Sequence, residues 1–144
     1  MAVIDMAKLT LAEAADALQG AGPVQMVNLL RFRAQAEYGD DSPLPRCTGQ
    51  EAYMQRYVPA FAEVAAKTAP GEAFRPVFLG AAVSTIVAEP GEQWHAVAIV
   101  EYDSFEGLRK VVESPEYEVL AAPHRRAALA DWRFIAVRQT ALPS

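Results

Sequence analysis

The residues best suited to chemistry are His124 and Arg125, which directly follow Pro123 at the start of a new helical turn. Free backbone amides and the helix dipole favour an anion at such a position. The Arg125 guanidinium can donate two parallel N–H hydrogen bonds to that anion, and a histidine such as His124 ordinarily titrates near neutral pH. We therefore expect a carboxylate or an enolate to dock here, with both residues as catalytic candidates. The alternative is a structural role, in which both side chains tie the broken helix to nearby carbonyl groups or to Asp131.

Three polar side chains from separate segments are candidate substrate-binding residues: Asn28, Tyr53 and Tyr117. Asn28 interrupts an apolar stretch, so its buried amide either orients a substrate carbonyl or hydrogen-bonds to a neighbouring strand or loop. Tyrosine combines an apolar ring with a polar hydroxyl, which suits both a core wall and a pocket lining. Tyr53 lies next to a long loop, and Tyr117 could face His124. Tyr57 falls on the apolar face of its helix, which favours a position in the core.

The remaining reactive side chains favour neither a metal site nor a covalent mechanism. One cysteine and two histidines are too few for a structural zinc site, and no third ligand accompanies His95 and His124 at a recognisable spacing. Cys47 has no second cysteine to resolve an oxidised thiol. His95 and Glu101 share one strand face, but they lie about 20 Å apart along it. We therefore expect no metal and no cofactor.

Three capping boxes, in which a hydroxyl or carboxylate residue precedes a Glu by three positions, predict where helices begin. They start at Thr10, Thr48 and Asp103. The first predicts a short leading helix over residues 10–19, and the third predicts a helix over residues 105–112.

The helix that begins at Thr48 carries one apolar stripe, which runs from Tyr53 to Val64. Pro59 removes a backbone donor inside this helix. We therefore expect a kink near Tyr57.

Apolar runs rich in β-formers predict four strands, over residues 24–32, 74–88, 93–102 and 132–140. A proline-glycine turn over residues 89–92 joins the second strand to the third, so these two should pair antiparallel. Residues 34–48 form an unusually long connection, of the kind that often borders a site. Ser114 restarts a helix after residue 112, and Pro123 breaks it again.

The order after the leading helix is strand, helix, strand, strand, helix, strand, which is the ferredoxin-like βαββαβ arrangement of an α+β protein with both helices on one sheet face. We divide the chain into a helical extension (residues 1–22) and a ferredoxin-like domain (residues 23–144). Residues 96–100 are apolar at every position, so the second sheet face must also be covered. The leading helix is too small to cover it. We therefore expect two copies to pair sheet to sheet as a homodimer.

Composition excludes several classes of partner. The 144 residues include 13 basic and 18 acidic side chains, a net charge of −5, and no basic run that could bind phosphates. We expect no nucleic-acid partner. No apolar stretch is long enough to span a membrane, and residues 1–6 lack the pattern of a signal peptide. We expect a cytoplasmic protein without a membrane partner.

Five short motifs in the same order resemble an uncharacterised bacterial family, a domain of unknown function within the dimeric α/β-barrel superfamily. The motifs are Val27–Phe32, Glu51-Ala52-Tyr53 with Tyr57, Gly91–Trp94 running into Ile99–Ser104, Ser114–Tyr117, and His124–Asp131. The match spans about residues 24–137, and this chain has His95 where the family usually has Asp. The resemblance implies a ferredoxin-like subunit that pairs sheet to sheet. It implies no particular activity, since the superfamily includes cofactor-free monooxygenases, lactone isomerases and haem enzymes.

Three functions are compatible with these features. The first is binding or processing of a small organic molecule, with an anion as one option, in a pocket between the sheet and the helices. The second is a cofactor-free isomerase or monooxygenase, in which His124 is the general base and Arg125 or Asn28 stabilises an oxyanion. The third is a purely structural dimer module.

Overall fold

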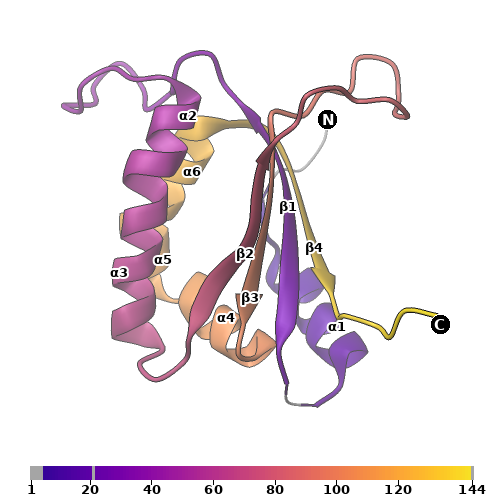
Figure 1. The fold of residues 1–144 in the computed structure, drawn as a ribbon. Coiled ribbons are helices and arrows are strands. Elements are labelled where there is room, and N and C mark those ends of the chain that lie inside the picture. Colours follow the sequence, from indigo (N-terminus) through magenta and orange to yellow (C-terminus); the bar gives the residue numbers. More distant parts are fainter. Residues whose placement is uncertain (1–4, 21, 144) are drawn as a thin grey trace.

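The protein is built on one four-stranded antiparallel sheet, seen in a computed structural model that describes residues 5–20 and 22–143 (Figure 1). The strands are β1 (Val24–Phe32), β2 (Phe74–Ala81), β3 (Ala96–Tyr102) and β4 (Leu129–Val137), in the spatial order β2-β3-β1-β4. Helical segments join β1 to β2 and β3 to β4, which is the ferredoxin-like arrangement. The predicted fold class is therefore confirmed. Within the expected extension over residues 1–22, residues 1–4 and 21 lie outside the described residues.

The helices pack on one face of the sheet. A leading helix, α1 (Lys8–Leu18), precedes β1, and α2 (Gly49–Glu51), η1 (Ala52–Tyr57) and α3 (Val58–Thr68) lie between β1 and β2. The segments between β3 and β4 are α4 (Phe105–Val112), α5 (Pro115–Leu120) and α6 (Ala122–Ala128). Figure 1 shows α3, α5 and α6 together as one helical layer beside the sheet. In the part of the chain that the structure describes, none of these helices is long and apolar enough to cross a membrane.

One of the three predicted capping boxes forms. The Thr48 hydroxyl accepts from the Glu51 amide at 3.1 Å, and the Glu51 carboxylate accepts from the Thr48 amide at 2.9 Å. The box predicted at Asp103 is wrong, because its carboxylate accepts from the Ala73 amide and Ser104 caps α4 instead. Tertiary contact competes with the local cap there.

The box predicted at Thr10 is also wrong. Helix α1 begins at Lys8, with Ala7 at the N-cap and no side-chain cap. The chain just before it is held by Asp5, whose carboxylate pairs with Arg125 of α6. The helix therefore begins where this tethered segment ends, rather than at the residue with the best capping side chain.

The irregularity expected near Tyr57 takes the form of a π-helical segment. Residues Ala52–Tyr57 form η1, and the Val58 amide donates to the Tyr53 carbonyl five residues back. Pro59 follows at the start of α3, where its missing N–H costs little. The wider turn places both Tyr53 and Tyr57 among the buried residues.

Both strands of the predicted hairpin are shorter than expected. The first, β2, ends at Ala81, and the second, β3, begins at Ala96. Residues 82–95 between them form an arm that extends beyond the sheet (Figure 1). At its base, the His95 amide donates to the Leu30 carbonyl at 2.8 Å and the Phe32 amide donates to His95 Nδ1 at 3.0 Å. His95 thus pairs with β1, and beyond that point the two sides of the arm leave the ladder.

The sheet has one covered face and one open face. Alternate residues of β1, from Val24 to Phe32, are buried under the helices, as a strand of period two requires. The opposite face, here called the open face, carries the apolar side chains of Val27, Leu29, Phe78, Val97, Ile99, Ile135 and Val137. Helix α1 does not cover them, since it lines a cavity with Met26 and Phe105 on the covered face. No described element covers the open face.

Gly49 provides a test of how the end of β1 meets α6. Its amide donates to the Arg33 carbonyl at 3.0 Å, and a methyl group there would lie 2.5 Å from the Ala128 carbonyl oxygen. Because these are backbone atoms that cannot rotate away, we expect Gly49→Ala to lower the free energy of unfolding by about 3 kcal/mol. Urea denaturation measures this. Gln50→Ala, at the next exposed position, should change it by less than about 0.5 kcal/mol, and equal effects would contradict the packing described.

Candidate functional site

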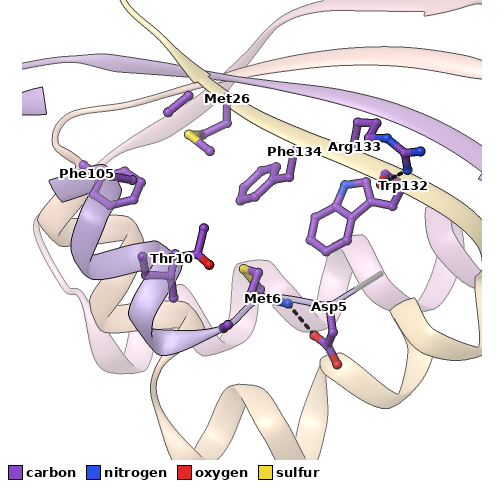
Figure 2. Close-up of a pocket in the computed structure, with 12 residues that line it drawn as sticks. Asp5, Met6, Thr10, Met26, Phe105, Trp132, Arg133 and Phe134 are labelled. Atoms are coloured by element: carbon purple, nitrogen blue, oxygen red, sulfur yellow. Dashed lines mark hydrogen bonds between the residues drawn. The ribbon is translucent and has the colours of Figure 1, made fainter. Parts of the chain in front are cut away.

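Two cavities lie between the sheet and its helices. The first, here called the central cavity, has a volume of about 120 Å³, with a floor that includes Asn28, Trp132 and Phe134 and a wall that includes Tyr53 and Tyr57. The second, here called the α1 cavity, measures about 330 Å³ and lies between α1, β1 and β4 (Figure 2). The two cavities therefore occupy neighbouring parts of the covered face.

Met6, Trp132 and Phe134 line both cavities. In Figure 2, Met6 lies below the Trp132 and Phe134 rings, which point from β4 toward α1. The Met6 side chain therefore stands at the boundary between the two spaces.

Asn28 holds the Trp132 ring in the cavity floor. Its Oδ1 accepts from the Trp132 indole N–H at 3.0 Å, while its Nδ2 makes only long contacts, 3.4 Å to the Met26 carbonyl and 3.3 Å to the Ala98 carbonyl. The amide therefore has a structural partner, as one sequence alternative required. Asn28 also lines the central cavity, with a donor that is weakly engaged.

Tyr53 and Tyr102 line the central cavity, and each carries a hydroxyl group. Within the described residues, neither hydroxyl makes a hydrogen bond. Burial raises the pKa of both. Tyr117 raises the pKa of Tyr53 further against the smaller opposing effect of the Arg125 charge, and Tyr53 and Tyr117 raise the pKa of Tyr102 further. Both phenols are therefore neutral near pH 7, so they can donate to a ligand or accept from it. Tyr102 was not among the binding residues predicted from the sequence, because the cavity that it lines is formed by distant segments that leave no local signal.

Tyr117 lies behind the cavity wall rather than in it. Its hydroxyl lies 2.8 Å from that of Tyr57, which does line the cavity, and it accepts from Arg125 Nε at 3.2 Å. Burial also raises the pKa of Tyr57 well above its ordinary value. A chain of hydrogen bonds thus connects the wall of the central cavity to Arg125.

Arg125 is almost completely buried, with 2% of its side chain exposed. Its guanidinium donates to Asp5 at 2.8 Å and lies 4.7 Å from the centre of the Trp132 ring. The carboxylate partner is therefore Asp5 rather than the Asp131 considered from the sequence; Asp131 instead pairs with Arg133 at 2.6 Å. Sequence reasoning missed Asp5, since a separation of 120 residues leaves no local signal.

Asp5 is bound by a second arginine as well. Arg126 Nε donates to the other carboxylate oxygen at 2.9 Å, and the Met6 amide donates to the first at 2.8 Å. Burial alone raises the pKa of Asp5, but the Arg125 charge and these hydrogen bonds outweigh it and hold the pKa below its ordinary value. Asp5 is therefore ionised near pH 7.

The structure does not bring His124 to either cavity. Its Nδ1 lies 2.7 Å from the hydroxyl of Tyr38, in the long connection after β1, and the Arg56 guanidinium stacks over the same Tyr38 ring. The contact links α6 to that connection, with a hydroxyl partner rather than the carbonyl groups or Asp131 considered from the sequence. Of the five site residues expected from sequence, Asn28 and Tyr53 line the central cavity, Tyr117 and Arg125 lie behind it, and His124 lies apart.

Other candidate residues have structural partners. His95 accepts from the Phe32 amide, and Glu101 pairs with Arg75 across β2 and β3. Within residues 5–20 and 22–143, no group of three or more His, Cys, Asp or Glu side chains could hold a metal ion.

Two solved structures of one protein are similar to this chain over almost its whole length. RPA0582, a protein of unknown function from Rhodopseudomonas palustris, is 28% identical with a TM-score of 0.77, over 99% of this chain and 100% of that chain. Methylated RPA0582 gives 29% identity and the same TM-score, over 96% of each chain. A dimeric protein of unknown function with a ferredoxin-like fold from Bacteroides fragilis is 18% identical, with a TM-score of 0.42, over 82% of this chain and 97% of that one.

No protein-family model and no curated protein matches the sequence. The resemblance to uncharacterised proteins is nevertheless confirmed by the similarity to RPA0582. That similarity covers nearly the whole chain, α1 included, and it brings no activity with it.

The His124 contact predicts a dependence of stability on pH. Burial lowers the pKa of His124 from its ordinary value of 6.5, and the Arg56 charge lowers it further. The unfolded chain therefore binds a proton that the folded chain does not, so the free energy of unfolding should be greatest above about pH 6.5 and fall as the pH drops below it. We expect His124→Asn, which keeps an acceptor for Tyr38, to flatten this slope in urea denaturation between pH 7.5 and pH 5. Identical slopes would contradict this role.

Proposed function

We propose that the protein binds a small organic molecule with an apolar body in the central cavity. The observation that carries the proposal is the pair of neutral tyrosines, Tyr53 and Tyr102, that line an otherwise apolar space and whose hydroxyl groups have no partner in the described chain. Ligand sites are usually apolar pockets with a few polar groups that fix orientation. The weakly engaged amide of Asn28 adds a third such group.

The character of the lining supports binding rather than acid–base chemistry in this cavity. Among the described residues that line it, tyrosines are the only ionisable ones, and burial keeps the phenols of Tyr53, Tyr57 and Tyr102 protonated near pH 7. A general base needs a pKa near the working pH. These side chains are suited to recognition by hydrogen bonds and ring contact.

The cavity opens to solvent beside α3. Val58 and Ala62 line it and are both exposed, so their side chains lie at its mouth. Access for a ligand then requires no movement of the sheet.

We expect Ala62→Phe to block this mouth and to weaken ligand binding at least about tenfold. The ligand is first found by native mass spectrometry against a metabolite library, and its affinity is then measured by calorimetry. Ala66→Phe, one turn further along α3 and also exposed, does not border the cavity and should bind as the wild type does. Equal weakening in both variants, or in neither, would place the ligand elsewhere.

We also propose that two copies pair through the open face as a homodimer. Phe78 and Ile135 on that face are 52% and 48% exposed, although aromatic and β-branched side chains of a sheet are normally buried. The arm adds Val83, Ile86 and Val87, which are 95%, 89% and 92% exposed. Pairing four-stranded faces buries on the order of 2,000 Å² in total, which is the size of a stable dimer.

Ile99 is the position at which this pairing can be tested. It lies near the middle of β3 and faces the open side. We expect Ile99→Asp to abolish the dimer and to leave aggregated or unfolded chain, because the apolar face is then neither paired nor soluble. Analytical ultracentrifugation at micromolar concentration measures this, and the unfolding midpoint of the wild type should rise with protein concentration.

The matched control for the dimer test is Val119→Asp, since Val119 is exposed on α5. This variant should remain dimeric. A wild-type protein that sediments as a folded monomer, with an unfolding midpoint independent of concentration, would overturn the homodimer.

A further inference from the structure

The buried Arg125 and its neighbour Arg126 form a carboxylate-binding site that the chain fills with its own Asp5. One Asp5 oxygen accepts from Arg125 at 2.8 Å and from the Met6 amide at 2.8 Å, and the other accepts from Arg126 at 2.9 Å. Two guanidinium groups and a backbone amide on one carboxylate are the arrangement that proteins use to recognise anionic ligands.

The two partners differ in how firmly they are held. The Arg125 side chain is 2% exposed and has further contacts with Tyr117 and the Trp132 ring, so its position is fixed by the core. The Asp5 side chain is 40% exposed and comes from the segment before α1. The site is thus rigid at Arg125 and accessible at Asp5 and at Arg126, which is 42% exposed and also pairs with Glu118.

The segment that carries Asp5 is lightly attached to the rest of the molecule. In residues 5–7, Asp5 and Ala7 are exposed and Met6 is partly buried, whereas α1 packs against the core through Leu11. Segments with little buried apolar surface open at low free-energy cost. Residues 5–7 can therefore move away from Arg125 while α1 stays packed through Leu11.

Removal of this segment would change the space available to a ligand. Asp5 and Met6 both line the α1 cavity, and Met6 also lines the central cavity (Figure 2). With Met6 displaced, the two spaces join across Trp132 and Phe134. The joined space would reach from the tyrosine hydroxyls to the guanidinium that Asp5 had occupied.

We propose that residues 5–7 act as a strap, and that the natural ligand is an apolar carboxylate whose carboxyl group replaces Asp5 at Arg125 and Arg126, while α1 remains as a wall of the cavity. This inference rests on the proposed binding function and adds the ligand class and its regulation. Asp5 competes with the ligand for the same two guanidinium groups. The apolar body of the ligand then occupies the joined cavity, and the strap is released as the ligand binds.

The test compares two probes that differ only in the carboxyl group, 4-phenylbutyrate and 4-phenylbutan-1-ol. Their affinities are measured by calorimetry for the full chain, for Asp5→Asn, and for Asp16→Asn, an exposed position on α1 that makes the same charge change. We expect Asp5→Asn to tighten phenylbutyrate binding about tenfold, because the competing carboxylate is gone. Binding of the alcohol should not change, and Asp16→Asn should behave as the wild type.

A second measurement requires no variant. Hydrogen exchange of the wild-type Met6 and Leu11 amides, which donate to Asp5 and to the Ala7 carbonyl, should become faster when phenylbutyrate is added, and should not change with the alcohol. Arg125→Lys, which keeps the positive charge but not the two-pronged donor, should remove the preference for the acid over the alcohol.

The outcomes separate the strap from the binding function. If both probes bind, and neither Asp5→Asn nor hydrogen exchange distinguishes acid from alcohol, the strap is wrong while the cavity remains a binding site. If neither probe binds to the wild type or to Asp5→Asn, the ligand is not an apolar carboxylate, and the proposed strap is wrong as well. If a metabolite then binds to the wild type and Ala62→Phe prevents that binding, the proposed binding function stands without the strap.

Discussion

Burial of one charged side chain, Arg125, constrains most of the covered face. A guanidinium removed from water must be paired, because an isolated buried charge costs far more than a fold of this size can offset. Its partners come from distant parts of the chain: Asp5 before α1, Tyr117 on α5 and the Trp132 ring on β4. The orientation of α5, α6 and the N-terminal segment therefore depends on the Arg125 guanidinium and on the groups that pair with it.

The same network determines the character of the central cavity. Tyr117 accepts from Arg125 and contacts the Tyr57 hydroxyl, which turns the polar end of Tyr57 toward the arginine and leaves its ring in the cavity wall. Asn28 fixes the Trp132 ring from the sheet floor, because its Oδ1 accepts a hydrogen bond from the indole N–H. Aromatic rings in this cavity are thus positioned by hydrogen bonds at their far ends. That leaves apolar surface and the Tyr53 hydroxyl for a ligand.

Local patterns predicted the parts of this structure that depend on local interactions. The order of strands and helices, the capping box at Thr48 and the irregularity before Pro59 all follow from residues within a few positions of each other. The errors arose where a distant segment supplied a better partner. Asp103 caps no helix because it binds the Ala73 amide, and Arg125 pairs with Asp5 rather than Asp131. Convergence of Asn28 and Tyr53 on one cavity could be expected from topology, whereas the position of His124 depended on where the long connection after β1 packs.

The alternation of β1 links the two proposed interactions of the protein. Met26 and Asn28 form part of the cavity floors, while Val27 and Leu29, which alternate with them, belong to the open face. Successive side chains of a strand share one backbone, so a shift of β1 against its neighbours moves both sets together. Burial of the open face by a second copy would hold β1 in register with β3 and β4. A ligand in the central cavity would then meet a floor whose geometry the dimer has already fixed, which lowers the ordering cost of binding.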